Sequence, residues 1–342
     1  MTDIWTRLKN EDKTVLIYGT GNGADKILDE LQRCNINVSG FFASSGFVRN
    51  RYFRGFKVMS IEEAEAAFGD FTILFAFGSN RPEVIANIKV LSQRHTVLAP
   101  EVPVCGGEVF NIEYAQRHAE ALHTAYSLLY DEQSRTVFEQ TTLFKLDGDI
   151  SRLFICETAE DEAFADILHL KNGSSFLDLG AYNGDTVLDF TKRVKDYGKI
   201  VAVEPDKKSF AKLLKNTDGI GITAINAAIS EHDGAIPFSF KSSRGSHSGG
   251  EDLIQSVCID SLARDVSFDY IKFDVEGNEA DAIKGGKLTI KNRKPKMLVS
   301  AYHKSDDYFT IPLLVHEINP DYKIFMRHYS YVPAWDTNYY FV

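Results

Sequence analysis

The chain has 342 residues, a length that suits two domains better than one compact core. Its composition, 44% hydrophobic and 25% charged, is that of a globular protein and excludes disordered, collagenous and low-complexity classes. The net charge of −10 argues against a binder of nucleic acid or anionic membranes, because phosphate partners require a basic face.

Neither a membrane span nor a disulfide framework is expected. No apolar run approaches the roughly 18 residues of a membrane-spanning helix, and the opening residues lack a signal peptide's apolar stretch. The four cysteines lie far apart without a C-x-x-C pair; they are Cys34, Cys105, Cys156 and Cys258. This usage indicates a reducing, cytoplasmic location and no zinc site.

Strand and helix signals alternate through the first hundred residues, which predicts a parallel α/β sheet. A basic, aromatic loop is expected at Phe47–Phe56. The expected strands are Thr14–Tyr18, Val38–Phe42, Thr72–Phe77 and Thr96–Leu98, and the expected helices lie around Ile27–Leu31, at Ile61–Phe68 and from Pro82.

A glycine turn, Gly19-x-Gly21-x-x-Ala24, follows the first strand. An NAD site would place an acid after the second strand, where this chain has Phe42-Ala43-Ser44, so ordinary NAD binding is not expected. NADP stays open, because arginines in the following loop could meet a 2′-phosphate; they are Arg49, Arg51 and Arg54. This half is similar to the small Rossmann-like domains of nucleotide-sugar modifying proteins, and it could equally be a structural or pairing module.

The spacing of the apolar residues changes after Val109. Apolar residues recur three and four apart from Ile112 to Leu129, and Gly and Pro are absent from Phe110 to Asp147, which predicts amphipathic helices. We therefore expect a Rossmann-like domain at 1–107, a helical connector at 108–150 and a second α/β domain at 151–342.

Alternation returns in the second α/β region. The expected strands are Ser175–Leu179, Ile200–Glu204, Gly221–Ala227, Ile236–Lys241, Tyr270–Asp274 and Met297–Ala301, and the expected helices begin near Asp185, Lys207, Glu279 and Tyr308. The last two β-rich runs, Tyr322–Arg327 and Thr337–Val342, leave no room for a helix between them and should pair antiparallel. The aromatic residues of this end are expected to pack the hairpin.

The turn after the strand ending at Leu179 carries the first candidate site. Its glycines let a ligand approach the backbone closely, and Asp178 can orient the turn or face a cationic ligand group. The alternative is an ordinary strand-to-helix turn capped by Asn183 or Asp185.

Glu204 follows the next strand, about 20 residues past the glycine turn. An acid at this position can accept hydrogen bonds from both hydroxyls of a ribose. The alternative is an N-cap or surface acid, a role that suits Asp206.

An acid cluster ends a later strand, in Phe273-Asp274-Val275-Glu276-Gly277-Asn278-Glu279. Paired carboxylates in a dry cleft repel, so one of them can stay partly protonated and serve as a base. For Asp274 we favour this functional interpretation. For Glu279 we favour a structural role, as an acid in the first turn of a helix where the helix dipole stabilises it.

These three stretches together resemble those of the FkbM-type methyltransferases. The matching segments are Leu177–Asp185, Val203–Pro205 and Ile271–Gly277, and the resemblance covers roughly residues 150–342. It implies an S-adenosylmethionine-dependent O-methyltransferase with a class I doubly wound sheet ending in an antiparallel hairpin. It also implies cofactor contacts at Asp178, Gly180, Ala181, Tyr182, Asn183, Glu204, Pro205 and Ala227.

The resemblance places Asp274 near the transferred methyl group. Many family members carry an acid after the fifth strand, where this chain reads Ser300-Ala301-Tyr302-His303-Lys304, so His303 would replace it. Asp274 and His303 are the expected candidates for the catalytic base. No ligand spacing supports a metal.

The polar, glycine-rich segment Ser242–Gly250 is either a plain surface loop or a lid over the acceptor. As a lid it would bring Arg244 or His247 to the substrate, beside Glu276.

We therefore predict methyl transfer from S-adenosylmethionine to a hydroxyl of a sugar, glycan precursor or other small metabolite. The rivals are an NADP-dependent oxidoreductase using the N-terminal glycine turn and a non-catalytic nucleotide-binding scaffold. A homo-oligomer stays open.

Overall fold

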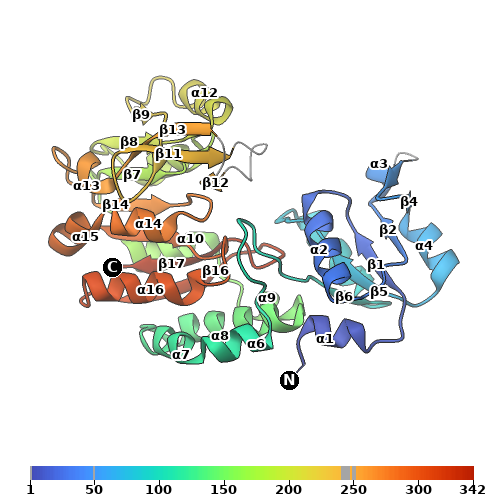
Figure 1. Ribbon diagram of the computed structural model, residues 1–342. Coiled ribbons are helices and arrows are strands. Elements are labelled where there is room, and N and C mark those ends of the chain that lie inside the picture. The colour runs from blue at the N-terminus through green and yellow to red at the C-terminus, as the bar shows by residue number, and fades with distance from the viewer. Residues whose placement is uncertain (1, 49–50, 240–246, 249–251) are drawn as a thin grey trace.

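The computed structural model describes residues 2–48, 51–239, 247–248 and 252–342. It places one sheet in each half of the chain, with helices from residues 112–155 lying below and between them in Figure 1. Among the described residues, no helix is long and apolar enough to cross a membrane.

The N-terminal sheet has six strands in the order β3-β4-β2-β1-β5-β6. Its central strands are apolar and fully buried, as a sheet covered on both faces requires. The pairs are parallel except β3 with β4. The strands are β1 (Val15–Tyr18), β2 (Gly40–Phe42), β3 (Tyr52–Phe53), β4 (Phe56–Met59), β5 (Thr72–Phe75) and β6 (Thr96–Leu98), and the helices are α1 (Ile4–Lys9), α2 (Asn22–Arg33), α3 (Ser45–Val48), α4 (Ile61–Phe68) and α5 (Pro82–Leu91).

The segment expected as a basic, aromatic loop contains regular structure instead. Helix α3 begins it, and β3 and β4 form a short hairpin at the sheet edge. Phe53 and Phe56 pack edge-on against Phe41 of β2, and these aromatic contacts give the hairpin an apolar face that composition alone did not reveal.

The connecting region is helical, as its period predicts. It consists of α6 (Ile112–Arg117), α7 (Ala119–Ser127), α8 (Glu132–Asp147) and α9 (Ser151–Ile155), followed by α10 (Glu160–Glu162) and the π-helical turn η1 (Ala163–Leu168). Val137 and Phe138 of α8 belong to the core of the C-terminal sheet, whereas Phe144 belongs to the N-terminal core. Helix α8 therefore packs against both halves.

The C-terminal sheet has seven strands in the order β16-β17-β15-β14-β7-β8-β9. Neighbouring strands are parallel except that β17 runs antiparallel to both β15 and β16. This confirms the expected doubly wound sheet with a terminal antiparallel hairpin. The strands are β7 (Phe176–Leu179), β8 (Ile200–Val203), β9 (Thr223–Ile225), β14 (Tyr270–Phe273), β15 (Lys296–Ser300), β16 (Ile324–His328) and β17 (Thr337–Phe341).

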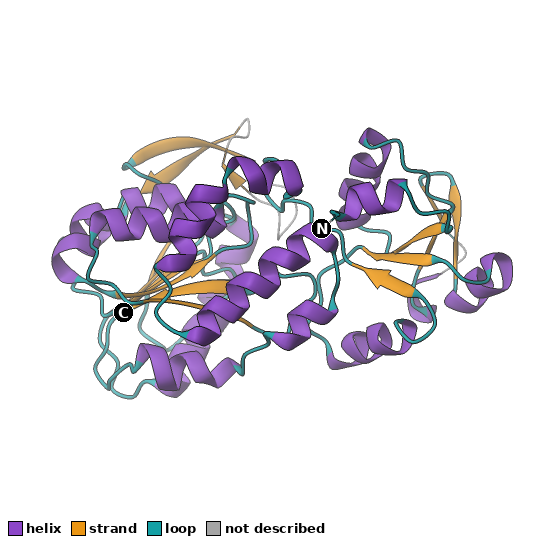
Figure 2. Ribbon diagram, turned by 90° about the horizontal axis from the view of Figure 1, so that it is seen from below, coloured by secondary structure: helices purple, strands orange, loops and turns teal. Residues whose placement is uncertain are grey.

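Helices lie on both sides of this sheet in the view of Figure 2. They are α11 (Asp185–Arg193), α12 (Lys207–Asn216), α13 (Ile259–Leu262), α14 (Glu279–Lys284), α15 (Lys287–Arg293) and α16 (Asp307–Ile318). Because β7, β8 and β14 are parallel neighbours, their carboxyl ends, and the residues that follow them, meet at one edge.

A second, small sheet was not expected. Its order is β10-β13-β11-β12, with β10 (Ala228–Ile229), β11 (Gly234–Ser239), β12 (His247–Ser248) and β13 (Asp252–Val257). The single strand expected at Gly221–Ala227 is therefore wrong in its extent, because β9 ends at Ile225 and the chain then joins β13.

The two halves share a core at the loop that joins β16 to β17. Val332 and Ala334 of this loop are buried in the N-terminal hydrophobic cluster, and Val332 forms a β-bridge with Ser79. The ring of Trp335 covers Gly78 so closely that a Cβ there would lie 2.3 Å from it.

Candidate active site

The glycine turn after β7 lies directly against the end of β14. The N–H groups of Gly180 and Ala181 both donate to the carbonyl of Val203, at 3.0 Å. Gly180 has a φ of +79°, and a Cβ on it would lie 1.9 Å from the carbonyl oxygen of Asp274. Only glycine fits this position, so the turn is held close to both neighbouring strand ends.

Glu204 ties the same turn to the end of β8. Its side chain is 7% exposed, and its two oxygens accept hydrogen bonds of 2.8 Å from the N–H groups of Tyr182 and Asp206. Burial raises the pKa of Glu204 to about 7, against the opposing effect of these two donors. Each carboxylate oxygen keeps a further lone pair that can accept a hydrogen bond from a hydroxyl group.

Two neighbouring positions complete this side of the site. Asp206 caps α12 by accepting hydrogen bonds from the N–H groups of Lys208 and Ser209, as its alternative role required. Asn226, which the sequence analysis missed, donates to the carbonyls of Glu204 and Pro205 at 2.8 and 3.0 Å. Ala227 is buried directly after it.

A mostly buried lysine connects the turn to the acid cluster. Lys272 Nζ lies 3.7 Å from Asp178 Oδ1 and 3.4 Å from Asp274 Oδ2. Burial raises the pKa of Asp178 to about 6 although Lys272 opposes the rise, and neither oxygen of Asp178 has a hydrogen-bond partner among the described residues. Lys272 was not predicted, because the sequence gives no sign that a lysine inside an apolar strand has two acids beside it.

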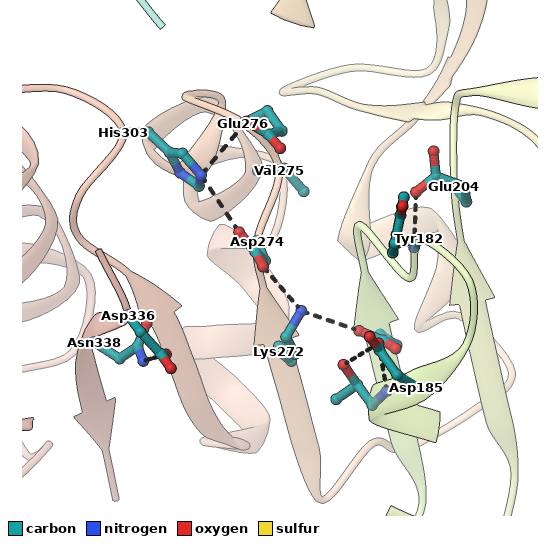
Figure 3. A network of polar contacts seen from close by, with 12 residues as sticks. Tyr182, Asp185, Glu204, Lys272, Asp274, Val275, Glu276, His303, Asp336 and Asn338 are labelled. Carbon is teal, nitrogen blue, oxygen red and sulfur yellow. Dashed lines mark hydrogen bonds and ion pairs between the residues drawn. The ribbon is translucent and has the colours of Figure 1, made fainter. Parts of the chain in front are cut away.

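His303 lies among three carboxylates. Its Nδ1 is 2.8 Å from Glu279 Oε1, and its Nε2 is 3.4 Å from Asp274 Oδ1 and 3.7 Å from Glu276 Oε2. Figure 3 shows Asp274 between His303 and Lys272, with contacts to both. Burial lowers the pKa of His303, but the three acids outweigh that effect and raise it to about 10. The imidazole is therefore protonated at neutral pH.

The carboxylates around His303 differ in their electrostatic state. Burial raises the pKa of Glu276 to about 7 against the effect of His303, whereas Lys272 and His303 together outweigh burial and lower that of Asp274. Glu279 begins α14 as expected. It is also fully buried, and it accepts a hydrogen bond from the N–H of Val275, so it is part of the cluster and not a solvent-facing acid.

Three ligand atoms of Asp274, Glu279 and His303 lie within 4.8 Å of one another, which makes these the described residues that could hold a metal ion. Glu279 and His303 pair directly with each other, at 2.8 Å between Oε1 and Nδ1. We assign no metal here.

The remaining sequence candidates lie apart from this cluster or outside the described residues. Arg244 and Arg49 are outside them, and His247 is described only as backbone, in β12. At the N-terminal glycine turn, Arg51 donates to the hydroxyl of Thr20, and Arg54 pairs with Asp25 at 2.7 Å. Both described arginines therefore have partners within the protein.

The C-terminal half matches a known protein family. Residues 178–332 match the family model described as the methyltransferase FkbM domain. The chain carries a methyltransferase FkbM domain. The match spans the glycine turn, Glu204, the acid cluster and His303, and the methyl donor of this family is S-adenosylmethionine.

A solved structure shares the fold over nearly the whole chain. A methyltransferase FkbM from Methylobacillus flagellatus KT aligns with a TM-score of 0.75 at 21% identity, over 96% of this chain and 90% of that one. An Aeropyrum pernix fibrillarin with natively bound S-adenosyl-L-methionine aligns with a TM-score of 0.34 at 15% identity, over 50% of this chain and 67% of that one. No curated protein sequence matches.

The residues of the FkbM domain fit a positively charged adenosyl donor. Glu204 has lone pairs for a ribose diol, and the carboxylates at the edge outnumber the cations Lys272 and His303.

Proposed function

We propose that this protein transfers the methyl group to a hydroxyl oxygen, with a sugar, a glycan precursor or another small hydroxylated metabolite as the acceptor. The observation that carries the proposal is the cluster of Asp274, Glu276 and buried His303 beside the glycine turn. A hydroxyl oxygen must lose its proton when it is methylated, and a carboxylate with a pKa near 7 is suited to accept it.

The cofactor side of the site is assigned to the glycine turn and the ends of β8 and β9. Gly180, Ala181, Tyr182 and Asn183 would hold the amino-acid part, Glu204 and Pro205 the ribose, and Ala227 would lie near the adenine. When bound, S-adenosylmethionine supplies a methyl group on a positively charged sulfonium. Asp178 would act through Lys272, because the carboxylate is fully buried and the ammonium lies beside it.

Within the cluster, we assign the proton transfer to Glu276. The expected bases were Asp274 and His303, but a histidine whose pKa is raised to about 10 is already protonated, and the pKa of Asp274 is lowered. Protonated His303 would instead hold Glu276 and Asp274 in place. Asp274, one-third exposed at the end of β14, would orient the acceptor hydroxyl toward the methyl group.

The test uses S-adenosylmethionine carrying a 13C-labelled methyl group. The protein is incubated with pools of free sugars, nucleotide sugars and small hydroxylated metabolites, and the products are examined by 13C NMR, which separates methyl groups on oxygen, nitrogen and carbon. We expect an O-methyl signal that disappears in Glu276→Gln. Label on nitrogen or carbon would overturn the hydroxyl acceptor. Binding of the donor without transfer to any pool would favour a non-catalytic scaffold.

A further inference from the structure

The segment after β6 carries the chain from the N-terminal sheet to the active site of the other half (Figure 1). Lys26 of α2 fixes its course, since its ammonium donates to the carbonyls of Pro103 and Val104 at 2.9 and 2.6 Å. Just before them, Glu101 forms a buried ion pair with Lys145 of α8. The segment is therefore anchored to both the N-terminal unit and the connecting helices.

Cys105 comes next in the chain and touches the acid cluster twice. Its N–H donates to the carbonyl of His303 at 3.1 Å, and its thiol donates to Glu276 Oε2 at 3.8 Å. Burial, and then the nearby Glu276, raise the pKa of the Cys105 thiol, so it keeps its proton at neutral pH and remains a donor.

The backbone that carries Glu276 needs such support. Glu276 and Gly277 have φ values of +52° and +91°, which places two consecutive residues in the left-handed region. A Cβ on Gly277 would lie 2.9 Å from the Cβ of Cys105, so the segment packs directly on this turn. Strained backbone at a functional site persists only where its surroundings hold it.

We propose that Cys105 is a positioning residue for methyl transfer, through which the N-terminal half holds the Glu276 carboxylate in the active site of the C-terminal half. This inference rests on the proposed function of Glu276 as the base. The thiol and the backbone N–H of one residue fix both members of the Glu276–His303 pair, so their spacing depends on a segment that the FkbM match, which begins at Asp178, does not include.

The groups that face Glu276 come from each element packed around it. They are His303 after β15, Asp274 at the end of β14, Glu279 in α14, and Cys105. His303 and Cys105 favour the ionised carboxylate, whereas Asp274 and Glu279 oppose it. Removing the thiol donor should therefore raise the pKa of Glu276 while the other three groups stay.

The experiment follows the protonation of Glu276 directly, by infrared difference spectroscopy of the full chain between about pH 5 and pH 9, without methyl donor or acceptor. The carboxylic-acid band missing in Glu276→Gln identifies this group. Cys105→Ala removes the thiol, and Cys105→Val removes it while filling more of its volume. In both variants we expect the midpoint of the Glu276 titration to move up by about half a pH unit, because a neutral hydrogen-bond donor is lost. Cys105→Ser, which keeps a donor, should retain the wild-type midpoint.

Cys258→Ala is the matched control, because that thiol donates to the hydroxyl of Ser261 at 3.4 Å and does not contact the cluster. An unchanged midpoint in Cys105→Ala and Cys105→Val overturns the proposal. An equal shift in Cys105→Ser or Cys258→Ala also overturns it, since the effect would then not come from the thiol donor. A failure to find O-methylation would leave this titration unaffected, so the two proposals fail separately.

Discussion

Replacing Lys272 with methionine removes the cation between Asp178 and Asp274 while keeping most of the side-chain volume. The ammonium is 3.7 Å from one carboxylate and 3.4 Å from the other, and only 13% of its side chain is exposed. At these distances each pair attracts by about 4.5–5 kcal/mol at an effective dielectric constant near 20, and much of this attraction offsets the burial of the charges.

The net loss is smaller than the summed attraction. Removing one partner of a buried ion pair costs about 3–5 kcal/mol, because the remaining charge is left uncompensated. Asp178 has no other partner among the described residues and can take up a proton once the ammonium is gone, so we expect the lower end of this range, a fall of about 3 kcal/mol in the free energy of unfolding near pH 8.

The loss should depend on pH. Burial holds the pKa of Asp178 at about 6 in the folded protein, above its ordinary value of 3.8, and without Lys272 it rises further. A carboxyl group that binds its proton more tightly when folded contributes stability at low pH, and this is lost as the pH rises through the folded pKa. The variant should therefore lose less stability near pH 5, where only the attraction to Asp274 is missing, and diverge further from the wild type above about pH 6.

Urea unfolding at several pH values, followed by circular dichroism, measures the difference. Lys208→Met in α12 is the control, since this lysine is exposed. Adding Asp178→Asn to Lys272→Met should recover at least half of the lost stability. If Lys272→Met loses no more stability than Lys208→Met, or loses it equally at every pH, the buried ion-pair reasoning is wrong.

Four further measurements test the site. Glu204→Ala should weaken binding of S-adenosylhomocysteine in calorimetry by about 1–3 kcal/mol, and an unchanged dissociation constant would remove Glu204 from the ribose site. Gly180→Ala should cost about 3 kcal/mol or more in urea unfolding, because its Cβ meets the Asp274 carbonyl, whereas Gly219→Ala, at the same φ of +79° in open space, should cost far less. Asp274→Asn should keep the fold and lower kcat about 100-fold, and full activity would exclude a catalytic role. The acid limb of kcat/KM should fall near pH 7 with the pKa of Glu276, and a limb that persists in Glu276→Gln would assign it to another group.

The meeting of Glu204 and Asp274 near the glycine turn could be predicted from the sequence. Each follows an apolar run that reads as a buried strand, and the carboxyl ends of parallel neighbouring strands lie at one edge. The apolar runs thus predict the strands of the sheet, and the acids that follow them predict which residues lie along its functional edge. His303 was also expected there, from its position after the fifth parallel strand.

The charge states within the cluster could not be predicted in the same way. They depend on which groups lie within a few ångströms, and the decisive neighbours are distant in the chain. Cys105 is 171 residues from Glu276, and Lys272 looks like any lysine in a strand until Asp178 is placed beside it. The sequence therefore favours His303 as a base, whereas in the structure three neighbouring acids raise its pKa to about 10.

The small sheet was missed for a different reason. Strand β13 lies beyond a polar, glycine-rich segment, and its partners β10 and β11 come from either side of a short turn. Leu253 on this strand is 73% exposed, so the run lacks the continuous apolar pattern by which the strands of the large sheet were identified.

The loop between β16 and β17 determines how this protein can be divided. Its Val332 and Ala334 complete the apolar interior of the other half, and Trp335 closes over Gly78. A fragment consisting of residues 151–342 would present these side chains to water, and the complementary N-terminal fragment would keep a hole where they belong. The catalytic half would therefore expose apolar surface without its companion, and we expect the two halves to be stable only when they are produced together as one chain.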